Sequence, residues 1–238
     1  MVKTFNKYKP VFKKFISLRK NIRNNFKLLK FKKKKWQKLI FFIKRSNQSK
    51  KKYYKYFDNN LHFIYKFGSN FKNKYSYRVK TSKKFRLFYG NLSKKYIKAK
   101  LNSFRYSSNY KNFTKSQLLL YKLEQRLDTI LYRSHFVTSI RTARQLISHG
   151  HILVNGKIVS TNSYNVKLGD KITVSSKIIF LIKFNIGNSS FWPLPPKYLC
   201  INYKTLEITL IENLGYTNFS TFFPFWVDWN TLAEHYKR

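Results

Sequence analysis

The amino-acid sequence predicts an α+β protein that combines a helical subdomain, a helix–helix–β-hairpin module with a small antiparallel sheet, and a long basic N-terminal arm. Three observations carry this prediction. Leucine and isoleucine recur at three- and four-residue spacing over residues 116–131, which is typical of amphipathic helices. Asn155-Gly156 separates two short apolar segments, the strongest short-range signal for a hairpin. Lysine-rich runs are frequent in the first 80 of the 238 residues.

Residues 1–80 are predicted to be an arm rich in basic and aromatic residues. The runs Lys32–Lys35 and Lys50–Lys52 consist of like charges, which stay extended or loosely helical without a partner. Aromatic residues are too frequent in this segment for a plain linker. We therefore expect the arm to become ordered on RNA, with partly helical stretches around residues 11–42.

Residues 81–115 are predicted to form a helical subdomain that the C-terminal segment completes in space. The segment Lys84–Gly90 is followed by a helical pattern over residues 93–101 and by a polar loop over residues 102–114.

Residues 116–177 are predicted to form the helix–helix–hairpin module. Its first helix begins near Ser116 and carries one continuous apolar stripe as far as Leu131. Thr138 or Ser139 caps the second helix, which ends at Gly150. The Asn-Gly turn needs positive φ at both positions, which is the requirement of a type I′ hairpin. A further turn at residues 168–171 leads into the strand 172–174.

Residues 178–238 are predicted to contribute C-terminal strands and an aromatic tail. The strands are expected at residues 198–203 and 207–211. The tail segment Phe222–Trp229 is expected to pack on the sheet or on a neighbouring molecule.

The charge of the chain is large and uneven. The formal net charge is +42, and 37 of the 50 basic residues lie in the first 123 residues, where Asp58 is the only acid. Such a chain favours a polyanionic partner. Nucleic acid is the first candidate, because Tyr, Phe and Asn alternate with the basic residues and can stack on or hydrogen-bond to bases. An anionic membrane surface is the second candidate, and a merely solubilising charged surface is the third.

Several classes of site are not expected. With Cys200 as the single cysteine, the sequence predicts neither an intramolecular disulfide nor a cysteine-based zinc site, and we expect no metal or cofactor. The longest apolar runs fall far short of the ~20 residues that span a bilayer. No secretory signal is visible in the sequence.

Arg141, Arg144 and Gln145 are the strongest candidates for RNA contacts. They share one side of the second helix with Ser148, opposite its apolar side, so we expect the arginines to point away from the core. Guanidinium groups match phosphate geometry. The alternative for this helix surface is simple solvation. Arg133 is expected either to bind a phosphate or to pair with Asp128, whose own role is expected to be structural.

The elements Arg126–Asp128, Tyr132-Arg133, Ala143–Ile147 and Val154–Lys157 resemble the small-subunit ribosomal protein S-four family. The resemblance is dense over residues 118–177. Weaker similarity covers Lys84–Gly90, residues 196–203 and residues 228–236. It does not cover the first 80 residues, and the cysteine knuckle of some bacterial members is absent. The candidate RNA-binding residues are Arg126, Arg133, Ser139, Arg141, Arg144, Gln145, His151, Lys157, Lys84 and Arg86.

The resemblance implies a structural constituent of the small ribosomal subunit that binds the 5′ domain of the small-subunit rRNA directly and supports assembly and translation. It implies neighbouring ribosomal proteins as partners and a position near the mRNA entry side, where mRNA is a further candidate partner. We expect no membrane binding, because residues 11–42 do not keep a clean apolar helix face, and no homo-oligomer. The abundance of residues with A/T-rich codons favours an organellar genome. A mitochondrial small subunit is the preferred location, and a plastid is the alternative.

Three other functions remain as alternatives. Pseudouridine synthases carry an Arg-Leu-Asp whose aspartate is the nucleophile, and residues 126–128 match it superficially, but too few residues follow for a catalytic domain. Lys80–Lys84 resembles the lysine loop of tyrosyl-tRNA synthetases only faintly. An assembly factor or RNA chaperone that uses the same module is the remaining alternative. We therefore expect binding rather than catalysis.

Overall fold

The computed structural model describes residues 12–18, 22, 32–41, 71–103, 115–189, 195–211, 223, 232 and 235–236. The chain divides into two compact units. One comprises residues 1–88 and 223–227, and the other comprises residues 89–222 and 228–238. Most of the predicted arm and most of the aromatic tail lie outside the described residues. The predictions for those segments therefore stay predictions.

The first unit contains α1 (Phe12–Leu18), a helical stretch over residues 34–41 and the long helix α3 (Phe71–Phe88). Phe85 and Phe88 of α3 are buried. The ring of Phe223 packs on both, with centroid distances of 6.1 and 5.0 Å. The described part of the predicted aromatic tail therefore packs on a helix of this unit rather than on the sheet.

In the second unit, the predicted first helix of the module is two helices, and the prediction of one continuous helix was wrong. α5 (Lys115–Glu124) ends before Arg126, and α6 (Leu127–Arg133) begins after it. Arg126 is extended, with φ −69° and ψ 135°, because the break forms a bridge to another segment. The amide of Leu127 donates to Tyr164 O at 2.9 Å, and the amide of Val166 donates to Gln125 O at 3.0 Å.

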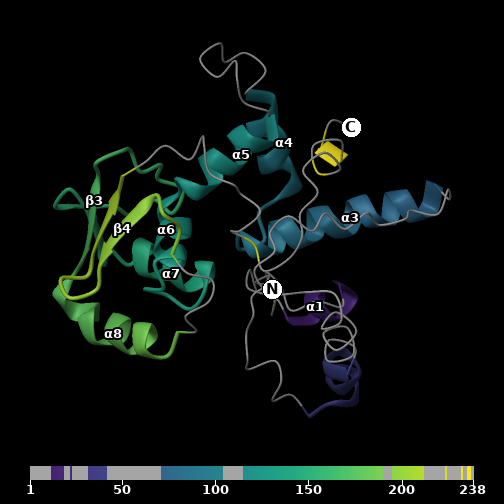
Figure 1. Cartoon of the computed structure of the whole chain (residues 1–238), viewed down its shortest axis with the longest axis horizontal. Helices are drawn as coiled ribbons and strands as arrows, with labels where there is room; N and C mark the ends of the chain where they lie inside the picture. The colour runs from purple at the N-terminus through teal and green to yellow at the C-terminus, as the bar shows by residue number, and fades with distance from the viewer. Residues whose placement is uncertain are drawn as a thin grey trace, which may run out of the picture. The chain divides into compact units, whose positions relative to one another are not determined.

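The predicted second helix is confirmed as α7 (Ile140–Ser148). Ser139 caps it by accepting a hydrogen bond from the amide of Thr142 at 3.2 Å. The chain leaves the helix through Gly150, whose φ of +71° is the left-handed conformation of helix C-termini. Ile140, Ala143 and Ile147 are buried on one side, as the spacing predicts. α6 and α7 pack side by side (Figure 1).

A five-stranded antiparallel sheet completes the second unit, in the order β2-β1-β3-β5-β4. The strands are β1 (Ile152–Val154), β2 (Lys157–Ile158), β3 (Lys171–Val174), β4 (Leu199–Asn202) and β5 (Glu207–Leu210). Ile152, Ile172 and Ile208 are fully buried on one face of the sheet, since residues paired across neighbouring strands share a face. The α+β class and the antiparallel sheet are therefore confirmed.

The β1–β2 hairpin turns as the Asn-Gly signal predicts. Asn155 and Gly156 have φ of 50° and 77°. Asn155 also joins this tip to the next turn, because its Nδ2 donates to Asp170 Oδ1 and its Oδ1 accepts from the amide of Lys171, both at 2.9 Å. Both turns are thus held together by one side chain.

α8 (Ile179–Gly187) follows β3 after a short 3₁₀ turn, Ser176–Ile178. It is the helix at the lower edge of the sheet in Figure 1. In the second unit, α4 (Lys94–Ser103) precedes α5 and buries Ile97 and Leu101. No helix among the described residues is long and apolar enough to cross a membrane.

Loss of the α7 cap should destabilise the second unit. We expect Ser139→Ala to lower the free energy of unfolding by about 1 kcal/mol, because the amide of Thr142 loses its acceptor, and Ser139→Gly to cost only a few tenths. Urea denaturation followed by circular dichroism measures both. Equal losses for the two variants would contradict a capping role.

Candidate RNA interface

A buried carboxylate, Glu124, joins four segments of the second unit. It lies at the end of α5 and is fully buried. Its Oε1 accepts hydrogen bonds from the Tyr89 hydroxyl at 2.5 Å and from an Arg133 terminal nitrogen at 2.6 Å. Its Oε2 accepts from Arg133 Nε at 3.0 Å and from the Tyr198 hydroxyl at 2.8 Å. The carboxylate is therefore saturated by one bidentate arginine and two phenols.

The electrostatics of this group hold both tyrosines neutral. Burial raises the pKa of Tyr89 and of Tyr198 well above the ordinary value of a phenol, and the negative charge of Glu124 raises it further. Burial alone lowers the pKa of Arg133, but the charge and hydrogen bonds of Glu124 reverse this, so that the net pKa is raised. The guanidinium stays charged and the phenols stay protonated, which is the state in which all four hydrogen bonds to Glu124 can form.

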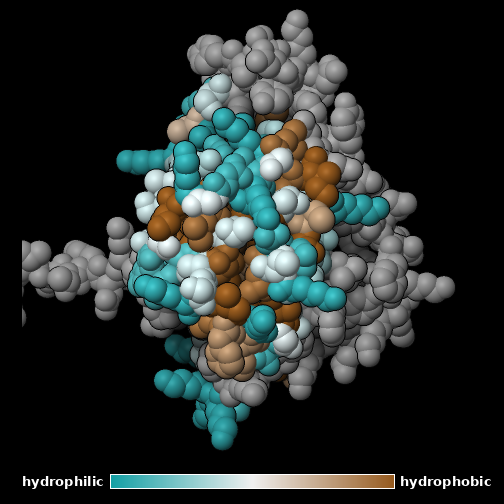
Figure 2. Space-filling view, turned by 90° about the vertical axis from the view of Figure 1, so that its left-hand side faces the viewer, coloured by the Kyte–Doolittle hydropathy of each residue, from teal (hydrophilic) through white to brown (hydrophobic). Residues whose placement is uncertain are grey.

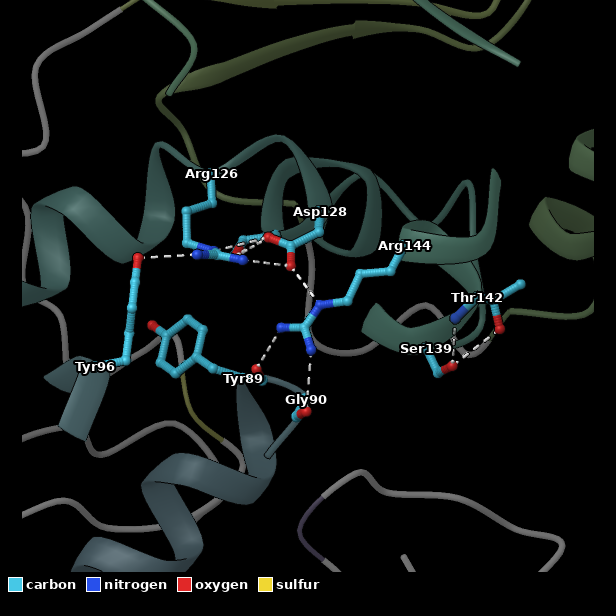
Figure 3. A network of polar contacts seen from close by, with 9 residues as sticks. Tyr89, Gly90, Tyr96, Arg126, Asp128, Ser139, Thr142 and Arg144 are labelled. Carbon is cyan, nitrogen blue, oxygen red and sulfur yellow. Dashed lines mark hydrogen bonds and ion pairs between the residues drawn. The ribbon is translucent and has the colours of Figure 1, made fainter. Parts of the chain in front are cut away.

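A second buried carboxylate, Asp128, binds two arginines (Figure 3). Arg126 is bidentate to it, with Nε to Oδ1 at 3.0 Å and a terminal nitrogen to Oδ2 at 2.9 Å. Arg144 Nε donates to the same Oδ2 at 2.7 Å. Arg126 also donates to the Tyr96 hydroxyl at 2.9 Å. Two positive charges thus share one negative charge.

Arg144 links α7 to the segment that precedes α4. Its terminal nitrogens donate to the carbonyls of Tyr89 and Gly90 at 2.9 and 3.1 Å. Gly90 has φ +72°, and a Cβ there would lie 2.9 Å from the guanidinium. Glycine is therefore required at this position for two reasons: the left-handed backbone conformation and the close approach of the arginine.

The structure corrects the predicted orientation of Arg144. The helical pattern predicts that it points away from the core, but its guanidinium reaches inward to Asp128, and only 26% of the side chain is exposed. The physical reason is the buried carboxylate on the neighbouring helix, which attracts the guanidinium across the interface of α6 and α7. Asp128 has the structural role that the sequence indicates.

Arg126 and Arg133 are both buried and ion-paired, with exposed side-chain fractions of 6% and 4%. Arg133 pairs with Glu124, which is neither the phosphate nor the Asp128 that the sequence left as alternatives. Its Nε and one terminal nitrogen both donate to that carboxylate. Neither side chain lies on the accessible surface of the second unit.

Other candidates from the sequence lie on or near the surface of the second unit. Gln145 and Lys157 are exposed, and Arg141 is half-buried. Ser139 is committed to the α7 cap and to a 2.9 Å hydrogen bond with the hydroxyl of Thr142. His151 is half-buried, with Nδ1 3.4 Å from the Ser175 hydroxyl. We name the exposed residues Gln145, Ser148, His149 and Lys157 the α7–hairpin surface.

Lys84 and Arg86 lie on α3 in the first unit, where both are half-buried. They belong to a different unit from the α7–hairpin surface. Among the described residues, no group of three or more His, Cys, Asp or Glu side chains is arranged to hold a metal ion.

Sequence reasoning missed the Glu124 group. Tyr89, Glu124 and Tyr198 were not predicted to interact, because they are separated by 35 and 74 residues along the chain. The available signal was Glu124 itself, since it is an acid within an otherwise apolar helix pattern next to a basic half of the chain. Such an acid is expected to be paired when it is buried.

Removal of the Glu124 charge should be strongly destabilising. We expect Glu124→Gln to lower the free energy of unfolding by about 3–5 kcal/mol, because Arg133 is left as an unpaired buried cation. Glu207→Gln is the matched control, since it removes the same charge from a partly exposed pair with Lys171, and it should cost less than about 1 kcal/mol. Urea denaturation of the full-length chain measures both, and similar losses would contradict the assignment.

The two buried phenols should make the fold sensitive to alkali. Their pKa is raised in the folded state, so unfolding releases protons once the pH exceeds the ordinary phenol value of about 10. Stability should be unaffected below that pH and should fall above it, by about 1.4 kcal/mol per pH unit for each phenol. Tyr198→Phe should remove one of these contributions. Denaturation series at pH 9 to 12 test this, and parallel curves for the two proteins would refute it.

The chain is similar to known proteins over much of its length. The model of the S4 domain family matches residues 125–172, from the break between α5 and α6 to the start of β3. The small ribosomal subunit protein uS4m of Reclinomonas americana is 33% identical over 180 residues, which cover 71% of this chain and 68% of the relative.

Two further relatives extend the comparison. The uS4c protein of Bigelowiella natans is 36% identical, with 61% of this chain and 75% of the relative covered. The uS4m protein of Marchantia polymorpha is 35% identical, with 66% and 77% covered. Organellar forms of one ribosomal protein therefore recur among the relatives. The chain belongs to the small ribosomal subunit protein uS4 family.

Proposed function

We propose that the chain binds small-subunit rRNA directly, through the α7–hairpin surface, as a structural constituent of the small ribosomal subunit. The observation that carries the proposal is the surplus positive charge at the interface of α6 and α7. Asp128 neutralises only one of the two arginines bound to it, and Arg144, the partly exposed one, lies on α7 beside Gln145. A phosphate is the natural counter-charge for such a group.

The geometry of the hairpin supports the same proposal. Asn155 is fixed by Asp170, so the neighbouring Lys157 projects from a rigid turn. Among the contacts of the described residues, the ammonium of Lys157 has no hydrogen bond or ion pair. Ile158 lies beside Gly150 at the end of α7, so the hairpin and the helix C-terminus adjoin. A preorganised cation loses little freedom when it meets a phosphate.

Arg126 and Arg133 have a different role in this proposal. Their guanidinium groups are paired with buried carboxylates, so these arginines position α6 and do not contact RNA. Lys84, Arg86 and the basic arm would widen the footprint and add salt-dependent affinity without sequence preference. We further propose that the chain contacts the 5′ domain of the rRNA, supports subunit assembly and is located in an organelle. The mitochondrial and chloroplast relatives support that location.

The pseudouridine synthase alternative is disfavoured by the state of Asp128. A nucleophilic aspartate must reach its substrate, whereas Asp128 is fully buried and accepts hydrogen bonds from two arginines. Family membership favours a structural, non-enzymatic protein. An assembly factor differs from this proposal in leaving the mature particle.

Charge reversal on the α7–hairpin surface tests the proposal. We expect Gln145→Glu with Lys157→Glu to weaken binding of the full-length chain to small-subunit rRNA on the order of tenfold at ~0.1 M salt. The salt slope should fall by about 1 for each lost phosphate contact. Filter binding over a salt series measures both quantities.

Lys204→Glu is the matched control. It reverses an exposed charge in the β4–β5 turn, at the opposite end of the sheet from the Asn155-Gly156 turn, and should leave affinity within about twofold. Equal losses for the two variants would show that only overall charge matters, and an unchanged affinity of the double variant would refute the site. Co-sedimentation of the chain with mature small subunits in high salt separates a structural constituent from an assembly factor.

A further inference from the structure

The outer side of α8 exposes an unusual amount of hydrophobic surface. Phe180 is 83% exposed, Phe184 63%, Leu181 44% and Ile179 36%. These four large side chains fall within six consecutive residues. Figure 2 looks onto the side of the molecule that holds the sheet and α8, and hydrophobic side chains gather there in a band between hydrophilic ones. Contiguous apolar surface of this kind marks an interaction site.

The exposure belongs to a well-anchored helix. Ile178 and Ile182 are buried beneath it, and Asn185 Nδ2 donates to the carbonyl of Phe136 at 3.2 Å. The helix end is closed by Asn188, whose Nδ2 donates to Phe184 O at 3.0 Å. α8 therefore cannot turn its outer side chains into the core without losing these contacts.

The border of this apolar surface is basic. Lys177 and Lys183 are exposed at its edges, and no acidic residue occurs between Lys171 and Leu206. The nearest acid along the chain after α8, Glu207, pairs with Lys171 at 2.7 Å. An occupant that matches both features is apolar at its centre and carries carboxylates around it.

Other occupants match less well. RNA would neutralise the lysines but would leave Ile179 and Leu181 against phosphate or sugar. A second copy would bring the same lysines and a formal charge of +42, so like charges would face one another. A lipid surface would take up the apolar side chains, but Lys183 is exposed at the edge of this surface, where a carboxylate neutralises it and hydrocarbon does not.

We propose that the outer side of α8 docks into an apolar groove of a neighbouring protein whose rim carries aspartate or glutamate. Phe180 and Phe184, one helical turn apart, are the anchors, as in other helix-in-groove contacts. Lys177 and Lys183 set the orientation through the acidic rim. The residues of α8 are different from those of the α7–hairpin surface, and the proposal does not depend on RNA binding there.

Photo-crosslinking identifies the occupant. The full-length chain carrying benzoylphenylalanine in place of Phe180 is assembled into small subunits, which are purified and irradiated. We expect one polypeptide to be linked, at a segment in which apolar residues adjoin Asp or Glu. Links to rRNA, to lipid, to a second copy or to residues 212–238 of the same chain would each overturn the proposal.

Two double variants then test the contributions of the phenylalanine anchors and of the two lysines to this docking. Phe180→Ser with Phe184→Ser should lower the occupancy of that polypeptide in purified subunits about tenfold, and Lys177→Glu with Lys183→Glu should lower it about fivefold. Leu168→Ser with Ile211→Ser, which removes exposed apolar side chains elsewhere, is the matched control and should change nothing. The rRNA affinity of the α8 variants should stay within twofold, which separates this outcome from failure of the proposed RNA site. Unchanged occupancy in both double variants would refute the proposal.

Discussion

Glu124 lies where four segments of the second unit meet, and the arrangement of that unit depends on its carboxylate. Tyr89, Arg133 and Tyr198 approach it from the start of the unit, from the end of α6 and from the segment before β4. An ion pair in such a place gives little net stability over an apolar substitute, but it tolerates no partial loss. Four hydrogen bonds meet at this carboxylate, so a shift of any one of these segments would leave a buried polar group without its partner.

Asp128 is also a buried carboxylate bound by arginine, but its charge is balanced differently. Glu124 is matched by one arginine, whereas Asp128 is shared by Arg126 and Arg144. The first group is neutral and internal, and the second carries a surplus positive charge at its partly exposed arginine. The chain therefore uses one carboxylate to fix the helices and the other to present charge at the surface. α8 adds a surface of a third kind, apolar with a basic border.

Much of the second unit was predictable because its signals are local. The α7 helix, its cap at Ser139 and the type I′ turn at Asn155-Gly156 depend on residues within a few positions of each other. The prediction of a single long helix was wrong because the apolar periodicity of the sequence continues through Arg126, whereas the helical backbone is interrupted there. Pairing of residues 125–127 with residues 164–166 supplies hydrogen bonds that a continuous helix would have to forgo, and such pairing leaves no local trace.

The sequence by itself indicated the family, through the resemblance of its motifs over residues 118–177. It also predicted the α7 helix and the hairpin, because helix capping and Asn-Gly turn chemistry are local, and its net charge favours a polyanionic partner. The tertiary structure alone decided which arginines are available. Arg133 pairs with Glu124, and Arg144 turns inward to Asp128, although the helical pattern assigns Arg144 to the open side. The reason is that a guanidinium follows the nearest desolvated carboxylate, and which carboxylate is near and desolvated depends on how distant segments pack.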